Sequence, residues 1–350
     1  MSTVLPEWPL FGVTDDVRPL LATAARTRTA AVLATLVRVD GGGPRPPGVQ
    51  MAFVGDEVAG YFSGGCVEGD VALHAQACRV DGEPRFLVYG AGSPWPDIRL
   101  LCGARIEIFL EHIGPDDPVL GELLEAALLR KPVVWVSDGH ERRLEPAVPE
   151  HTPDGVICRP YDPVPRLVVV GSDPIALAIA DLGARTGYET TLVRPKGPAE
   201  PPPLAGVGYL RDEPAAALKR IGLDRWTAVA VATHDLDTDE AALHAALDSD
   251  AGYVGLLGAR ARLPERLARL KRGGVPDRAL ARLRAPIGLD IGGKAPWEVA
   301  ISVMGEITAL RYARSKTSTS TSSPSASAGA PGARRTSAPA EAKTVTSEES

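Results

Sequence analysis

The sequence has few cysteines and no spacing that would pair them. Among 350 residues there are four cysteines, and no two of them have CxxC spacing: Cys66, Cys78, Cys102 and Cys158. A disulfide scaffold of this length would need more of them, and a CxxC redox motif is absent. We therefore expect free thiols and a reducing compartment, the cytoplasm.

Long apolar segments and an excess of basic residues are also missing. The longest apolar stretches, such as residues 30–37, are too short to cross a bilayer. The first residues lack the basic start and apolar stretch of an export signal. Asp and Glu (44) outnumber Lys and Arg (38), which gives a formal charge of −6. These absences argue against a membrane partner and against a dedicated nucleic-acid binder, which normally has a basic face.

Length and composition predict a folded protein of about two domains. Apolar residues make up 44% of the chain and charged residues 23%, which excludes disorder of the whole chain. Residues 315–350 are rich in Ser, Thr, Ala and Pro, and this composition cannot offset the entropy of ordering. We expect one domain over residues 1–163, a second over residues 164–314, and a disordered tail over residues 315–350.

The second domain alternates strand and helix patterns. Leu167 to Val170 are a continuous apolar run, which is typical of a parallel strand buried on both faces. Apolar residues at helical spacing follow between Ile175 and Leu182. Further strands are predicted near residues 190–193, 207–210, 227–232, 253–257 and 287–291. This alternation predicts an α/β, Rossmann-like doubly wound parallel sheet.

The first domain has a mixed pattern that predicts an α+β fold. Helices are expected over residues 17–28, 67–79 and 120–129. Strands are expected over residues 31–39, 51–54, 57–62, 105–111, 133–136 and 156–160, with a hairpin at Gly55-Asp56. A proline-rich stretch at residues 160–165 is the expected linker.

The most distinctive local motif is SGGCVEG at residues 63–69. Gly64 and Gly65 allow a sharp turn, and Cys66 would lie where a helix begins. Free N–H groups and the positive end of the helix dipole favour a thiolate there, and the same backbone can bind a phosphate. The structural alternative is a small buried residue that closes a strand-to-helix turn.

Two other segments of this domain carry candidate ligands. Arg45 lies in GGGPRPPG at residues 41–48, where prolines stiffen the loop, and a pre-ordered arginine suits a phosphate. The alternative is a solvated loop arginine. Cys102 precedes a predicted strand and would face Cys66 across a cleft, or else belong to the core. Cys78 and Cys158 are expected in the core.

The turn after the first strand of the second domain departs from a dinucleotide-binding fingerprint. In Gly171 to Ala176 the middle glycine of GxGxxA is replaced by Asp173, whose carboxylate would repel a pyrophosphate. Binding of NAD(P) is therefore doubtful. At the ends of later strands, where this architecture binds ligands, lie His234, Asp235, Arg260 and Asp290. The acidic residues at 237–240 are interpreted as a helix cap, with Asp237 as the N-cap, rather than a metal site.

Taken together, these motifs resemble the XdhC/CoxI family of accessory factors for xanthine dehydrogenase and related molybdenum hydroxylases. The matching segments are GGGPRPPG, SGGCVEG, the CG at 102–103, ATHD at 232–235, YVGLLGAR at 253–260 and APIGLDIGGKAPWEVAISVMGEI at 285–307. The resemblance covers about residues 17–312. It implies an XdhC/CoxI-type domain followed by an XdhC-type Rossmann domain.

The resemblance implies a chaperone, rather than an enzyme, that binds the molybdenum cofactor (molybdopterin), supports its sulfuration by a cysteine desulfurase and delivers it to the molybdoenzyme. Thiolates of Cys66 and Cys102 would meet the metal or its sulfido group, and Arg45 and the helix start would meet the phosphate. The full set of expected cofactor-binding residues is Arg45, Gly64, Gly65, Cys66, Glu68, Cys102, His234, Asp235, Arg260 and Asp290. A homodimer is compatible with this role.

Two alternatives remain open. One is a Rossmann-type NAD(P)-dependent oxidoreductase with His234 as acid and base, which the turn at Asp173 disfavours. The other is a thiol or persulfide sulfur carrier that uses Cys66 and Cys102. The family usually has GAGHVA at residues 171–176 and an aspartate at Arg194, so this chain has an altered nucleotide-like pocket but an intact cysteine motif.

Overall fold

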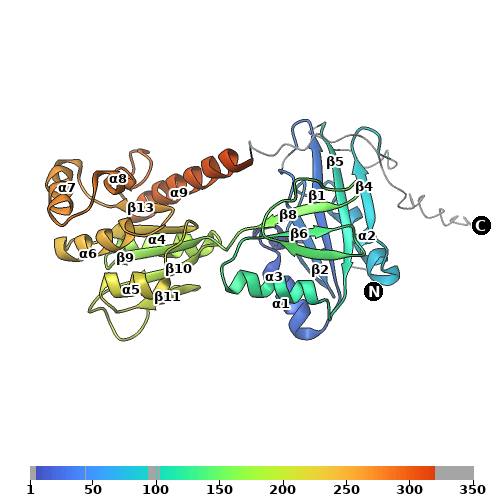
Figure 1. The fold of residues 1–350 in the computed structure, drawn as a ribbon, viewed down its shortest axis with the longest axis horizontal. Helices are drawn as coiled ribbons and strands as arrows, with labels where there is room; N and C mark the ends of the chain where they lie inside the picture. Colours follow the sequence, from blue (N-terminus) through green and yellow to red (C-terminus); the bar gives the residue numbers. More distant parts are fainter. Residues whose placement is uncertain (1–4, 44, 94–99, 101–102, 320–350) are drawn as a thin grey trace, which may run out of the picture. The chain divides into compact units, whose positions relative to one another are not determined.

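The computed structural model describes residues 5–43, 45–93, 100 and 103–319. Within them the chain divides between Asp162 and Pro163 into two units, each with a core on both faces of its own sheet. Each unit contains both helices and strands (Figure 1). The α/β fold class predicted from the sequence is confirmed.

The N-terminal unit is built on a five-stranded antiparallel sheet of order β3-β2-β1-β5-β4 and a three-stranded sheet of order β7-β6-β8. Its elements are η1 (Leu10–Gly12), α1 (Arg18–Thr27), β1 (Ala31–Asp40), β2 (Gln50–Val54), β3 (Glu57–Ala59), α2 (Glu68–Asp81), β4 (Arg85–Tyr89), β5 (Arg105–Ile113), α3 (Pro118–Leu128), β6 (Val133–Ser137), β7 (Arg142–Glu145) and β8 (Ile157–Tyr161).

The central strand β1 is apolar along most of its length because both faces of the sheet are covered. Val32 and Leu36 point into the core that α2 closes, whereas Leu33 packs with α1, α3 and the second sheet. Successive side chains of a strand point to opposite faces, so a strand between two cores is apolar at every position. This arrangement fixes α2, and the loop before it, against one face of the sheet.

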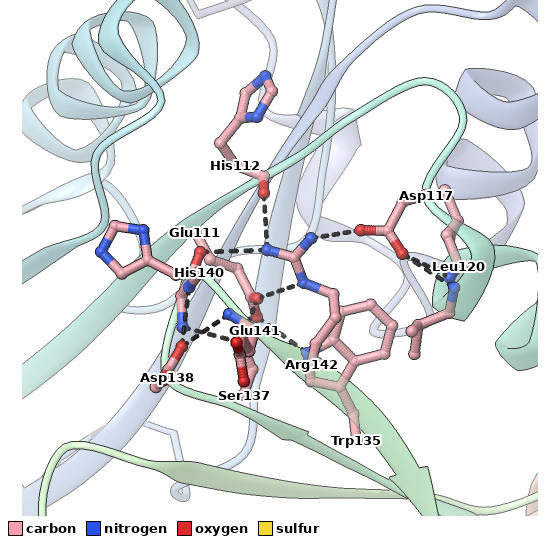
Figure 2. Close-up of polar contacts among 12 residues, drawn as sticks. Glu111, His112, Asp117, Leu120, Trp135, Ser137, Asp138, His140, Glu141 and Arg142 are labelled. Atoms are coloured by element: carbon pink, nitrogen blue, oxygen red, sulfur yellow. Dashed lines mark hydrogen bonds and ion pairs between the residues drawn. The ribbon is translucent and has the colours of Figure 1, made fainter.

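A buried ion-pair network joins the two sheets of this unit (Figure 2). The carboxylate of Glu111 on β5 is fully buried and accepts hydrogen bonds from Trp135 Nε1 (3.0 Å), Ser137 Oγ (2.6 Å) and Arg142 Nε (3.3 Å). Arg142 also pairs with Asp117, the N-cap of α3. Burial raises the pKa of Glu111, against the opposing effects of these donors. Each buried charge here has its partners on neighbouring elements.

The C-terminal unit has a six-stranded sheet of order β11-β10-β9-β12-β13-β14, in which all strands are parallel. Its elements are β9 (Arg166–Gly171), α4 (Pro174–Arg185), β10 (Glu189–Val193), β11 (Val207–Leu210), α5 (Pro214–Ile221), β12 (Thr227–Ala232), α6 (Leu236–Leu247), β13 (Tyr253–Leu256), η2 (Arg260–Arg262), α7 (Leu263–Arg272), α8 (Asp277–Leu280), β14 (Leu283–Arg284) and α9 (Pro296–Thr319). Helices α4 and α9 pack on one face, and α5, α6 and α7 on the other. This is the predicted Rossmann-like doubly wound sheet.

Several elements differ from the sequence-based expectation. The last strand is β14, and residues 287–291, where a strand was predicted, form no strand. Strands β4 and β7 and the short helix α8 were not predicted. Helix α9 continues to Thr319, beyond the predicted start of the tail at residue 315, and residues 320–350 lie outside the described part of the chain. Among the described residues, no helix is both long and apolar enough to span a membrane.

The network around Glu111 gives a prediction about stability. Arg142→Ala leaves a buried carboxylate without its cation, and we expect the free energy of unfolding to fall by about 3–5 kcal/mol. The neighbouring Arg143 pairs with Glu145 on the surface, so Arg143→Ala is the matched control, with an expected change of about 0.5 kcal/mol. Urea denaturation of the two variants compares them; equal effects would contradict the role assigned to Arg142.

Candidate functional site

The cysteine motif forms a tight loop that leads into α2. Gly64 and Gly65 have φ values of +86° and +118°, in the left-handed region that other residues rarely adopt. Cys66 follows them and directly precedes Val67, the N-cap of α2. The predicted placement of Cys66 at a helix N-terminus is therefore what the structure shows.

The carboxylate of Glu68, the first residue of α2, fills the inside of this loop. Each of its oxygens accepts three hydrogen bonds. Oε1 accepts the backbone N–H groups of Phe62 (2.9 Å), Ser63 (2.6 Å) and Gly64 (3.2 Å); Oε2 accepts those of Gly65 (2.9 Å) and Val67 (3.2 Å) and the Ser63 hydroxyl (2.8 Å). The loop's amides therefore bind an anion that belongs to the chain itself.

Glu68 is charged in this position although it is buried. Only 2% of the residue is exposed, and burial alone would raise the pKa of its carboxyl group. The hydrogen bonds from Ser63 and Phe62 outweigh burial and hold the pKa below its ordinary value. A carboxylate that accepts several backbone N–H groups is stabilised in its ionised form.

Cys66 itself is exposed at the outside of the loop. Its backbone N–H donates to Ser63 Oγ at 3.0 Å, which fixes the main chain that carries the thiol. The other described cysteines differ: Cys78 is buried, and burial raises the pKa of its thiol to about 11, while Cys158 on β8 is half-buried. Cys66 is the exposed one among the described cysteines, so its sulfur is accessible to a reactant or a soft metal.

Arg45 lies beside the start of this loop. Its guanidinium donates to Tyr61 Oη (3.1 Å), packs over the Tyr61 ring (4.6 Å to the centroid) and pairs with Asp15. Arg45 Nε is buried and has no hydrogen-bond partner among the described residues. Tyr61 directly precedes Phe62, so Arg45 is held next to the cysteine loop. It is a pre-ordered cation, although one of its faces is already occupied.

The third segment of the predicted site is described only in part. Cys102 lies outside the described residues. A side-chain carbon built on Gly41 would lie 3.6 Å from Cα of Ala104, which places the loop containing Arg45 against the start of β5. The structure thus brings together residues 41–43 and 45–48, the Cys66 loop and the chain at residues 103–104 at one end of the five-stranded sheet.

The other candidates lie in the C-terminal unit, at the carboxyl ends of its parallel strands. The carboxylate of Asp173 caps α4 by accepting the Ala176 N–H (2.8 Å), and it also contacts His234 Nε2 (3.1 Å). Strands β9 and β12 are neighbours in the sheet. The chain continues from β9 to β10 on one side and from β12 to β13 on the other, so Asp173 and His234 lie at the topological switch point. Asp173 therefore occupies the helix end where a Rossmann domain binds a pyrophosphate.

Two further residues, which follow later strands of the same sheet, form an exposed ion pair. Arg260 Nη2 lies 3.1 Å from Asp290 Oδ2, and both side chains are more than three-quarters exposed. Asp235, rather than the predicted Asp237, is the N-cap of α6, where it accepts the Thr238 N–H at 2.7 Å. The capping-box interpretation was therefore wrong in register, and Asp237 instead pairs with Arg269.

Sequence reasoning missed the partners that organise the site. Ser63, Tyr61 and Asp15 were not among the predicted residues, and Glu68 was expected to bind cofactor rather than the loop. One usable signal was present: an acidic residue in the first turn of a predicted helix, shortly after a pair of glycines, is suited to accept the turn's free N–H groups.

The comparisons with known proteins agree with this architecture. A model of the XdhC Rossmann domain matches residues 167–307, and a model of the XdhC and CoxI family matches residues 24–90. Over 315 residues the chain is 32% identical to the molybdenum cofactor insertion chaperone PaoD of Escherichia coli, in a match that covers 87% of this chain and 92% of PaoD. The chain belongs to the XdhC/CoxI family.

Two other relatives match along most of their length. A probable xanthine dehydrogenase subunit of Bacillus subtilis is 26% identical, over 80% of this chain and 93% of that protein. The crystal structure of a xanthine dehydrogenase from Bacillus halodurans superposes with a TM-score of 0.72 and 26% identity, over 88% of this chain and 98% of that one. The family resemblance drawn from the motifs is confirmed.

The Asp173 cap gives a prediction for the XdhC Rossmann domain. Asp173→Ala removes an N-cap, and we expect it to lower the free energy of unfolding by about 1 kcal/mol. His234→Ala removes only an exposed partner of the same carboxylate and should change it by about 0.5 kcal/mol or less. Urea denaturation measures both.

The same residue is expected to keep dinucleotides out. Titration of the wild-type protein with NADPH, followed by nicotinamide fluorescence, should show no saturable binding because the Asp173 carboxylate would repel the pyrophosphate. Tight binding by the wild-type protein would contradict this reading of the turn.

Proposed function

We propose that this protein binds the molybdenum cofactor, supports its sulfuration and delivers it to a xanthine dehydrogenase-type molybdenum hydroxylase in the cytoplasm. The observation that carries the proposal is the exposed Cys66 on an anchored loop at the N-terminus of α2. The cofactor is a cargo rather than a resident group, so its site has to be open on one side. An exposed thiol meets that requirement.

The residues around Cys66 fit the chemistry of this cargo. Molybdopterin holds molybdenum through sulfur, and a thiolate is a ligand for soft metal centres. Arg45 is positioned beside the loop and carries a fixed positive charge suited to the terminal phosphate. The name of the E. coli relative, a molybdenum cofactor insertion chaperone, supports the same assignment.

The two units contribute unequally to this function. In the Rossmann-like unit the phosphate position is taken by Asp173, so an NAD(P)-dependent oxidoreductase has no support from this turn. We assign Cys66, Arg45 and the glycine loop to cargo binding. His234, Asp235, Arg260 and Asp290 are proposed as polar contacts at the strand ends, and Cys102 as a second sulfur ligand.

The proposal is tested by the affinity of the purified protein for molybdopterin. Cys66→Ala should weaken binding about tenfold, or about 1.4 kcal/mol, because it removes the sulfur that contacts the metal end of the cargo. Cys158→Ala is the matched control, since Cys158 lies on β8 with Thr152 as its contact, and it should bind normally. Fluorescence titration measures both; equal affinity of the wild-type and Cys66→Ala proteins would remove Cys66 from the mechanism.

Support of sulfuration requires that the protein work with a sulfur donor such as a cysteine desulfurase. The exposed Cys66 also favours a role as a sulfur carrier, compatible with cargo binding. In that role Cys66 attacks the outer sulfur of the donor's persulfide, so that Cys66 becomes a persulfide and the donor keeps a thiol. After incubation with a desulfurase and cysteine, mass spectrometry should find an addition of about 32 daltons on the peptide with Cys66. An unmodified Cys66 beside a modified Cys158 would contradict the carrier role.

A further inference from the structure

The loop before α2 has the construction of an anion-binding site. A glycine-rich turn that points successive N–H groups inward, followed by a helix N-terminus, commonly binds phosphate. Here five backbone N–H groups and one hydroxyl converge, but the group they bind is the carboxylate of Glu68. The N–H groups that could bind a phosphate thus bind a side chain of the protein itself, and this carboxylate anchors the loop.

The hydrogen bonds continue from Glu68 to the residue that carries the thiol. Ser63 Oγ donates its one hydrogen to Glu68 Oε2 (2.8 Å) and accepts the N–H groups of Cys66 (3.0 Å) and Val67 (3.2 Å). A hydroxyl has one donor and two acceptor positions, so Ser63 is fully used. The backbone of Cys66 is therefore connected to Glu68 through one side chain, and its own side chain is left outside.

The negative charge of Glu68 also affects which ligands can approach the loop. The donors to Glu68 are neutral groups, so its negative charge remains inside the loop. A phosphate that approached the same amides would have to displace Glu68 or meet its charge at close range, which is unfavourable in a region of low dielectric. Phosphate recognition is then left to cations outside the loop, such as Arg45.

We propose that Glu68 is a positioning residue that holds the Cys66 loop open to cargo and closes its amides to phosphate. This rests on the function proposed above. The loop then meets the cofactor through sulfur chemistry at Cys66, and the phosphate of the cofactor lies elsewhere. The inference assigns Glu68 a role different from the direct cofactor contact expected from the sequence.

The first part of the test needs no cofactor. In Glu68→Gln, one oxygen and the negative charge are lost from the anchor, and amide hydrogen exchange of residues 62–67 should accelerate about tenfold or more. Asp70→Asn is the matched control: Asp70 lies in the same first turn of α2, where its carboxylate accepts the Tyr89 hydroxyl at 2.6 Å and lies 3.6 Å from His74 Nε2. That variant should leave the exchange of residues 62–67 unchanged.

The second part relates the anchor to Cys66. Glu68→Gln should change the rate of Cys66 alkylation and weaken molybdopterin binding about tenfold, whereas Asp70→Asn should do neither. Ser63→Ala, a smaller change in the same chain of hydrogen bonds, replaces Glu68→Gln if that variant does not fold. Excess inorganic phosphate should leave exchange of residues 62–67 in the wild-type protein unchanged.

Each result separates the inference from the function it rests on. Unchanged exchange in Glu68→Gln, or phosphate protection of the wild-type loop, would overturn the anchor. Faster exchange with normal cofactor affinity and normal alkylation would overturn the positioning role. If the wild-type protein does not bind molybdopterin, the proposed function fails, while exchange and alkylation still decide whether Glu68 positions Cys66.

Discussion

The site depends on the buried carboxylate of Glu68. Among the described residues, the groups that donate hydrogen bonds to it are neutral, and no basic side chain pairs with it. Glu68 is stabilised by backbone N–H groups of the turn that precedes it, and this fixes three things together. It sets the conformation of Gly64 and Gly65, it determines where α2 begins, and it leaves Cys66 on the outside. A carboxylate buried with fewer donors would be costly, so the loop and the helix start stabilise each other.

The same solution recurs at other helix starts of this protein. Asp117, Asp173 and Asp235 cap α3, α4 and α6 with their own carboxylates. For α3 and α6 this is an ordinary cap, but at α4 it occupies the position where a Rossmann domain would bind a phosphate. The turns before α2 and α4, one in each unit, therefore both hold an internal anion, and of these two the turn before α2 presents a thiol beside it.

The strands and helices were largely predictable because they follow from apolar periodicity. The apolar run in β9 indicated burial on both faces of the sheet, and the two cores that flank it confirm this. Strand β14 was not found because it has only two residues and is defined by pairing with β13. The start of α6 was placed about half a turn late because Asp235 and Asp237 are equally good caps locally, and the close connection to β12 decides between them.

Side-chain partners in the site were less predictable than the elements that carry them. The motif placed Cys66 correctly at a helix N-terminus, but the direction of the Glu68 side chain depends on the turn conformation, which no periodicity reports. Likewise Arg45 was recognised as a fixed cation, while its contacts with Asp15 and Tyr61 come from segments far apart in the sequence. Long-range pairing of polar groups leaves little local signal.

The most direct test is to locate the cofactor on the protein. Hydrogen exchange of the full chain, measured by mass spectrometry with and without bound molybdopterin, reports which segments the cargo covers. The account predicts protection at residues 41–48 and around Cys66, at one end of the N-terminal sheet. Protection confined to the turns after β9 and β12, with the Cys66 loop unaffected, would contradict it.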